Sequence, residues 1–238
     1  LAGVFFQVGT DDAYSLRLEL PLGVADFHPA VLRHRQIVLA DLIILRQVRV
    51  IIVFTFELGL AGDLTIERKR RAHGKLEGAA GERTGGDPSL IETDIGPVID
   101  AEQLRMLNEH IFAMRKGQKV RFAGKAPEEG LYFAPHIVEL NKAEALEREI
   151  FGPVLHVVRW RAGQLDKVLD QIDATGFGLT LGVHTRIEET VRQVVARLDA
   201  GNIYVNRNMI GAVVGTQPFG GSGLSGTGFK AGGPHYLL

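Results

Sequence analysis

The sequence predicts an α/β fold, because strand-like runs of branched apolar residues alternate with helical hydrophobic stripes through its second half. The chain has 238 residues, of which 45% are hydrophobic and 23% are charged. These proportions are typical of a globular protein with a sizeable apolar core. The glycine-rich stretch 201–238 keeps apolar residues at spacings that indicate ordered structure rather than a flexible tail.

The composition excludes several classes of function. Lysine and arginine total 27 against 28 aspartate and glutamate residues, so no net field attracts nucleic acid or an anionic membrane. The apolar stretch 37–60 contains four charged residues, each of which costs about 2.5–3.5 kcal/mol at the middle of a bilayer. Cysteine is absent, which excludes disulfides, thiolate metal sites and a cysteine nucleophile within these residues. We expect a cytoplasmic protein with no nucleic acid, membrane or metal partner.

Residues 1–86 carry the weaker signals. Strand-like runs occur at 37–39, 42–45 and 48–56, and a basic cluster at 68–71 is followed by a stretch rich in glycine at 73–86. The basic cluster favours a solvated loop over a nucleic-acid patch, because no aromatic residues are interleaved for base stacking. We place a boundary after residue 86 and leave residues 1–86 unassigned, as a fused segment or a mistranslated one.

The first elements of the second half are a helix and three extended segments. Asp100 is expected to cap a helix, with Gln103 completing a capping box and Leu104, Leu107 and Ile111 forming its buried stripe. Strands are expected at 119–123 and, after a Gly-Pro turn, at 154–160. Between them, an extended segment at 132–138 is interrupted by Pro135.

A second group of elements repeats this alternation. Apolar residues at 165, 168, 169 and 172 predict a helix, and 181–185 and 203–205 predict strands. Between these strands, Thr185 and Glu188 form a second candidate capping box before a helix with an apolar face at Ile187, Val191, Val194, Val195 and Leu198. Gly201 is expected to end that helix in the left-handed conformation.

Five strings in the second half carry a family resemblance. They are TDIGPVID at 93–100, EIFGPV at 149–154, GNIYVNR at 201–207, QPFGG at 217–221 and GLSGTGFKAGGP at 223–234. In this order they resemble the carboxyl-terminal part of an aldehyde dehydrogenase superfamily catalytic domain. The resemblance is greatest to the L-glutamate γ-semialdehyde (pyrroline-carboxylate) dehydrogenase module of bifunctional proline-utilisation A flavoenzymes. The implied fold is a partial aldehyde dehydrogenase domain at 87–238, preceded by a poorly defined segment.

The resemblance implies roles for five residues. Glu149 resembles the carboxylate that binds the nicotinamide ribose hydroxyls, and Phe151 the aromatic residue beside that ribose. Gly211 and Ala212 resemble the loop whose amides hold the carboxylate of the aldehyde substrate, and Phe219 the aromatic residue that packs on the substrate's aliphatic part. Ser225 is interpreted as a turn residue rather than a ligand. Arg207 and Lys230 are interpreted either as groups that attract an anionic substrate or as surface or structural cations.

The family's reaction needs groups that this sequence does not contain. A cysteine thiolate attacks the aldehyde, NAD accepts the hydride, and a glutamate-activated water releases the acid. No cysteine and no upstream Gly-x-Gly dinucleotide unit is present, so we assign no catalytic residue. We expect the chain to be inactive alone, with NAD as cofactor of the complete enzyme and a homo-oligomer as its assembly. The alternative is a non-catalytic remnant that binds carboxylates or acts as an oligomerisation module.

Overall fold

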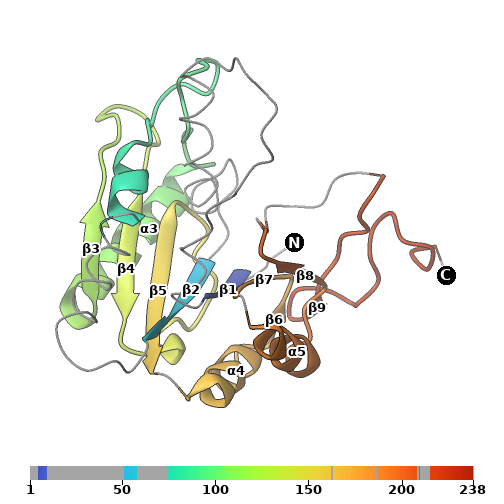
Figure 1. The fold of residues 1–238 in the computed structure, drawn as a ribbon. Coiled ribbons are helices and arrows are strands. Elements are labelled where there is room, and N and C mark those ends of the chain that lie inside the picture. The colour runs from blue at the N-terminus through green and yellow to red at the C-terminus, as the bar shows by residue number, and fades with distance from the viewer. Residues whose placement is uncertain are drawn as a thin grey trace, which may run out of the picture.

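The computed structural model describes residues 5–9, 51–57, 74, 76–161, 163–185, 187–207, 209 and 215–237. Figure 1 shows its elements in chain order. They are β1 (Phe5–Gly9), β2 (Ile51–Glu57), α3 (Ala101–Gly117), β3 (Lys119–Ala123), β4 (His136–Leu140), the 3-10 turn η3 (Ala143–Ala145), β5 (Val154–Arg161), α4 (Leu165–Asp173), β6 (Phe177–Gly178), β7 (Thr180–His184), α5 (Glu188–Arg197), β8 (Asn202–Val205) and β9 (Ser222–Gly223). A helical segment at 76–81 precedes α3. No helix in these ranges is both long and apolar enough to cross a membrane.

A seven-stranded sheet organises the fold, in the order β3-β4-β5-β2-β1-β7-β8. All neighbouring pairs are parallel except β3 with β4, which are antiparallel. Strands β6 and β9 form a separate two-stranded antiparallel pair. The predicted α/β class is confirmed, since parallel neighbours joined by helices are its defining arrangement.

The two strands from the first quarter of the chain lie in the middle of this sheet. β2 pairs with β5, and β1 pairs with both β2 and β7, so that Phe5 faces Ile51 on one side and Thr180 on the other. The strand expected at 48–56 therefore forms at 51–57. The runs at 37–39 and 42–45 and the basic cluster at 68–71 lie outside the described residues.

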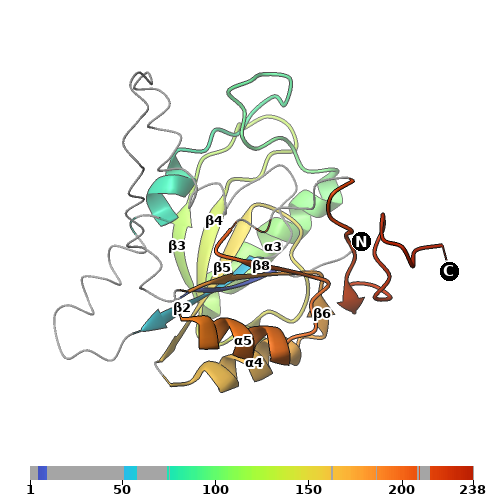
Figure 2. The ribbon, with the colours of Figure 1, turned by 45° about the vertical axis from the view of Figure 1, so that its right-hand side comes forward.

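The core has two unequal parts, one on each face of the sheet. The larger part joins apolar residues of β4, β5 and β7 to the buried faces of α3, α4 and α5. Figure 2 shows α4 and α5 side by side below the sheet, with α3 behind β4 and β5. The smaller part contains Ala80, Ile137, Leu155 and Val157. Because side chains alternate along a strand, Val154, His156 and Val158 face α3 while Leu155 and Val157 face away from it.

The helix expected after Asp100 is present as α3. The Asp100 carboxylate accepts a hydrogen bond from the Gln103 backbone amide at 2.7 Å, and Leu107 and Ile111 are buried. Only the Asp100 half of the expected capping box forms, and the Gln103 side-chain amide donates to the carbonyl of Phe151. The strands expected at 119–123 and 154–160 and the helix near 165–172 are also confirmed. The segment at 132–138 becomes a strand only after Pro135.

The helix expected after Thr185 is present as α5, but three expected details of it are wrong. The Thr185 hydroxyl accepts from the amide of Ile187, two residues on, so no capping box forms with Glu188. Ile187 and Val195 are exposed, and the buried contacts of this segment come from Val194 and Leu198. Gly201 does not adopt a positive φ. It is required for another reason, since a Cβ there would lie 1.7 Å from the carbonyl oxygen of Gly220.

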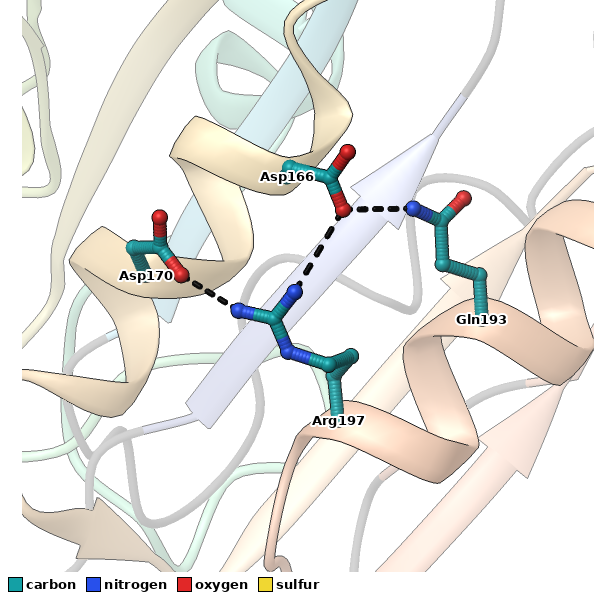
Figure 3. A network of polar contacts seen from close by, with 4 residues as sticks. All are labelled: Asp166, Asp170, Gln193 and Arg197. Carbon is teal, nitrogen blue, oxygen red and sulfur yellow. Dashed lines mark hydrogen bonds and ion pairs between the residues drawn. The ribbon is translucent and has the colours of Figure 1, made fainter.

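A polar network joins α4 to α5 on the surface. Arg197 of α5 reaches Asp166, at 3.4 Å, and Asp170 of α4, and Gln193 donates to Asp166 at 2.6 Å. Figure 3 shows the guanidinium of Arg197 between the two carboxylates, with Gln193 beside Asp166. The three charged side chains are exposed and Gln193 is partly buried, so we expect the network to contribute little to stability.

Candidate functional site

The loop that contains Glu149 and Phe151 leads directly into β5. Glu149 is partly buried, whereas the Phe151 side chain is 46% exposed. The Phe151 carbonyl accepts a hydrogen bond from the Gln103 side-chain amide. The next residue, Gly152, packs on α3 so closely that a Cβ would lie 2.6 Å from a methyl group of Leu107. The loop is therefore fixed on the first turns of α3, with an aromatic ring open to a ligand.

The exit of this loop is held by the sheet. The amide of Val154 donates to the Gly152 carbonyl at 2.8 Å, which closes the turn around Pro153. The Pro153 carbonyl accepts from the amide of His136 at 2.9 Å, at the start of β4. Proline fixes φ in this turn, and the two bonds fix the direction in which the chain enters β5.

A buried histidine pair lies behind the loop. The Nε2 atoms of His110 and His156 are 2.9 Å apart, and the rings meet edge to face. Burial, with a smaller effect of the charges of Arg148 and His136, lowers the pKa of His110 to about 4. Burial, with a smaller effect of His110, lowers the pKa of His156 to about 3. Both rings are therefore neutral at pH 7, and the contact between them joins α3 to β5.

A second candidate region is built around Phe219. Its amide and carbonyl exchange hydrogen bonds with Ala231, at 3.1 and 2.9 Å. The side chain of Asn202, the first residue of β8, donates to the Pro218 carbonyl at 3.0 Å and accepts from the Gly220 amide at 3.4 Å. The close approach of Gly201 to Gly220 completes the contact. These bonds hold the string at 217–221 beside the start of β8.

An open hollow of about 460 Å³ lies next to this string. Two cations, Arg207 and Lys230, line it together with the amide side chains of Asn202 and Gln217. The guanidinium of Arg207 also lies over the ring of Tyr204, 4.8 Å from its centroid. The described lining residues include no carboxylate, so the hollow presents positive charge and hydrogen-bond donors, which suit a carboxylate ligand.

The two candidate regions lie at the same end of the sheet's parallel strands. The loop at 149–153 precedes β5, the string at 217–221 lies beside the first residue of β8, and the strands between them are parallel. Four strand spacings separate β5 from β8, or about 19 Å at the usual spacing. Both regions therefore lie at the amino ends of these strands.

The remaining expected site residues fare differently. Gly211 and Ala212 lie outside the described residues. Ser225 is buried, and its hydroxyl accepts from the amide of Gly178 at 3.1 Å, which agrees with a structural role. Within the described ranges, no group of three or more histidine, aspartate or glutamate side chains is placed to hold a metal ion.

The sequence gives no site role to three residues that make contacts at the site. Gln103 was expected only as part of a helix cap, and His110 and His156 attracted no expectation. The one signal for the histidines is position, because His110 falls one turn after Leu107 on the buried stripe of α3 and His156 falls on an inward position of β5.

Comparison with known proteins adds independent evidence. A family model described as "Aldehyde dehydrogenase family" matches residues 67–238. The bifunctional protein PutA of Klebsiella aerogenes is 55% identical over 170 residues, which cover 68% of this chain and 13% of that protein. The PutA of Rhizobium meliloti is 54% identical over 153 residues, covering 63% and 12%. A 1-pyrroline-5-carboxylate dehydrogenase of Halalkalibacterium halodurans is 38% identical over 157 residues, covering 65% and 30%.

Solved structures give the same result for the fold. A crystal structure of a bifunctional proline utilization A (PutA) protein matches 99% of this chain with a TM-score of 0.77 and 40% identity. A 1-pyrroline-5-carboxylate dehydrogenase structure also matches 99%, with a TM-score of 0.68 and 28% identity. The matches cover 22% and 42% of those chains. The chain thus spans a minor part of each relative.

Proposed function

The chain belongs to the aldehyde dehydrogenase family, and from this premise we propose that it forms the carboxyl-terminal part of an NAD-dependent dehydrogenase that oxidises L-glutamate γ-semialdehyde to glutamate in proline catabolism. The observation that carries the proposal is the 55% identity to a bifunctional PutA protein over 170 residues. Because the chain spans 13% of that relative, the activity is proposed for the larger catalytic unit. A cytoplasmic location, homo-oligomeric assembly and a boundary after residue 86 belong to the same proposal.

The loop at 149–153 supports a nicotinamide cofactor. The family uses NAD or NADP, of which we propose NAD, and the bound cofactor would accept the hydride. A carboxylate only accepts hydrogen bonds, so Glu149 is suited to two ribose hydroxyl donors. Phe151 offers an open aromatic face beside it. The residues present therefore fit a nicotinamide ribose, with Glu149 orienting it and Phe151 shielding one side from water.

The region around Phe219 supports a carboxylate-bearing aldehyde as the substrate. The apolar ring of Phe219 suits a short methylene chain, and the hollow beside it collects the positive charges of Arg207 and Lys230. We propose that the amides of Gly211 and Ala212 bind the substrate carboxylate and that the two cations attract it. A substrate with a carboxylate at one end and an aldehyde at the other matches this division of charge and apolar surface.

The chemical step itself needs a group from outside this chain. The family reaction uses a thiolate to form a covalent thiohemiacetal with the aldehyde carbon, and the sequence holds no cysteine. We propose that these residues bind and orient cofactor and substrate, while the nucleophile and the water-activating base belong to the rest of the catalytic unit.

Saturation-transfer NMR with NADH tests the cofactor part of the proposal. We expect saturation of the nicotinamide-ribose protons to exceed that of the adenine protons, because the binding groups present are those for the nicotinamide end. The Glu149→Gln variant should lose this preference, whereas Glu147→Gln, an exposed neighbour, should retain it. Equal saturation of both ends in the wild type would contradict the assignment of Glu149 and Phe151.

A second candidate function is a non-catalytic carboxylate-binding module, favoured by the absence of cysteine from all 238 residues. Calorimetric titration with glutamate, with the Arg207→Gln/Lys230→Gln variant as comparison, measures the carboxylate site alone. Heat with glutamate that disappears in the variant, together with no preference for the nicotinamide end of NADH, would favour this function over the dehydrogenase role.

A further inference from the structure

We propose that Gln103 is a positioning residue for the loop at 149–153, and that its side-chain amide sets the orientation of Glu149 and Phe151 toward the cofactor. The inference rests on the proposed function of these two residues. It assigns a role to a side chain of α3 that lies 48 positions before Phe151 in the sequence. The family resemblance gives this side chain no ligand-binding role.

The position of Gln103 itself is fixed by the start of its helix. The Asp100 carboxylate accepts from the Gln103 backbone amide at 2.7 Å, and the backbone of Leu104 bonds back to the Asp100 carbonyl at 3.2 Å. The first bond satisfies one of the amides that a helix start leaves open, and the second is the first regular bond of the helix. The side chain of Gln103 thus departs from a rigid point and is available for a contact outside α3.

That contact falls between two backbone hydrogen bonds on either side of the loop. Before it, the amide of Leu146 bonds to Ala143. After it, the amide of Val154 bonds to Gly152. The Gln103 amide group holds the carbonyl of Phe151 between these two points. Because a peptide unit is planar, fixing this carbonyl fixes the plane that follows Phe151 and limits the directions open to its ring.

Two further contacts keep α3 and the loop in register. Leu107, one turn after Gln103, packs against Gly152, and His110, nearly two turns on, meets His156 two residues inside β5. Residues at these spacings lie on one face of a helix. This face of α3 therefore contacts Phe151, Gly152 and His156 in succession. Gln103 is the residue of this face that lies nearest the candidate cofactor residues.

Two substitutions separate this role from a contribution to helix stability. Gln103→Glu has the same size and removes the donor, yet a negative charge in the first turn favours the helix. Gln103→Lys restores a donor on a longer chain, and its positive charge disfavours the helix. Gln103→Glu should therefore give the more stable helix and the less ordered loop, and Gln103→Lys the reverse. Ala101→Glu and Ala101→Lys place the same charges in the same turn, away from the contact between Gln103 and Phe151.

Hydrogen–deuterium exchange of the loop peptide at 147–155 in the full chain is the primary readout. We expect Gln103→Glu to speed exchange roughly 2- to 12-fold, the factor corresponding to one ordinary hydrogen bond, while its melting temperature is unchanged or higher. Gln103→Lys should exchange like the wild type despite a lower melting temperature. Wild-type exchange in Gln103→Glu, or exchange that follows the melting temperature in all four variants, would overturn the proposal.

NADH saturation transfer then connects positioning to binding. Gln103→Glu should weaken the nicotinamide-ribose signal and Gln103→Lys should preserve it. If the wild type shows no such signal, the proposed cofactor role of Glu149 fails, while loop exchange still decides whether Gln103 positions the loop. If the wild type shows the signal and Gln103→Glu leaves both signal and exchange unchanged, the cofactor role stands and the positioning role is wrong.

Discussion

The Nε2 atom of His110 on α3 lies 2.9 Å from the Nε2 atom of His156 on β5, in the interior of the protein. Such a contact requires one ring to donate and the other to accept, so the pair holds one proton between these two atoms. The Nδ1 atom of His156 has no hydrogen-bond partner among the described residues. Adding a second proton to this buried pair would place a charge in the interior, so we expect protonation to destabilise the folded state.

We predict that the protein loses stability as pH falls below about 6.5, the ordinary pKa of histidine. The folded pKa values of His110 and His156, about 4 and about 3, lie below that of the unfolded chain, so the unfolded state takes up protons first. Stability is complete above pH 6.5 and decreases toward pH 4, by up to about 1.4 kcal/mol per pH unit for each histidine. Urea unfolding at a series of pH values measures the slope.

A matched variant identifies the source of this slope. His110→Leu/His156→Leu should reduce the slope between pH 6.5 and 5 but leave a part of it, because burial also lowers the pKa of His136 and of His184. His235→Asn, at an exposed position, should leave the slope unchanged. An unaltered slope in the double variant would show that other groups carry the dependence.

The pair should also be strongly non-additive under mutation. His110→Leu alone leaves His156 buried without its partner, and we expect a loss of about 1–3 kcal/mol in the free energy of unfolding. Replacing both rings removes the unpartnered group, so the double variant should lose less than the two single variants together. A double-mutant cycle from urea unfolding at pH 7 measures the coupling, and strict additivity would contradict the hydrogen bond.

Gly201→Ala should destabilise the protein by about 3 kcal/mol or more, because the new Cβ would lie 1.7 Å from the Gly220 carbonyl oxygen. The backbone of 218–221 would have to move away from β8 and give up its bonds to Asn202. Gly117→Ala is the control, since a Cβ there meets no atom within 4 Å. Thermal unfolding compares the two, and equal effects would contradict the close approach.

Arg197→Gln should reduce stability by less than about 1 kcal/mol, because its partners on α4 are exposed and screened by solvent. The effect should shrink further in high salt. Arg192→Gln, whose partners Glu188 and Glu189 lie on the same helix, gives the comparison for pairs that do not join two helices. A salt-independent loss for Arg197→Gln would point to packing rather than charge.

The chain alone should produce no NADH from NAD and glutamate γ-semialdehyde, since no thiol is present to attack the aldehyde. Absorbance at the reduced nicotinamide band against a protein-free control measures this directly. NADH formation that depends on the protein would show that this chain uses a nucleophile other than cysteine.

Local signals in the sequence predicted the elements well. Asp100 ahead of an apolar stripe located α3, and alternating apolar residues located β3 and β5, because these patterns depend on near neighbours. The capping box predicted from the Thr185–Glu188 spacing was wrong for a local reason, since the threonine hydroxyl accepts from the nearer amide of Ile187. The left-handed conformation predicted for Gly201 was wrong for a distant reason, since glycine is required there by the close approach of Gly220 across a loop.

The assembly of the site could be predicted only in part. The strings around Glu149 and Phe219 pointed to the two regions, and their roles stay predictions. The contacts of Gln103 with Phe151 and of His110 with His156 could not be read from either segment, because each joins residues 46 or more positions apart. Such contacts depend on how α3 packs on the sheet, which no pattern within one window of sequence specifies.

The central position of β1 has a consequence for how the protein is made. Phe5 pairs with Thr180, so β1 meets one of its partner strands only after the long segment between β1 and β7 has been synthesised. Closing such a long loop is slow, and sheets dominated by distant pairings fold late. Until then the strand's hydrogen-bonding edge stays open to other chains. We expect the yield of folded protein in cells to depend on chaperones that hold the nascent chain.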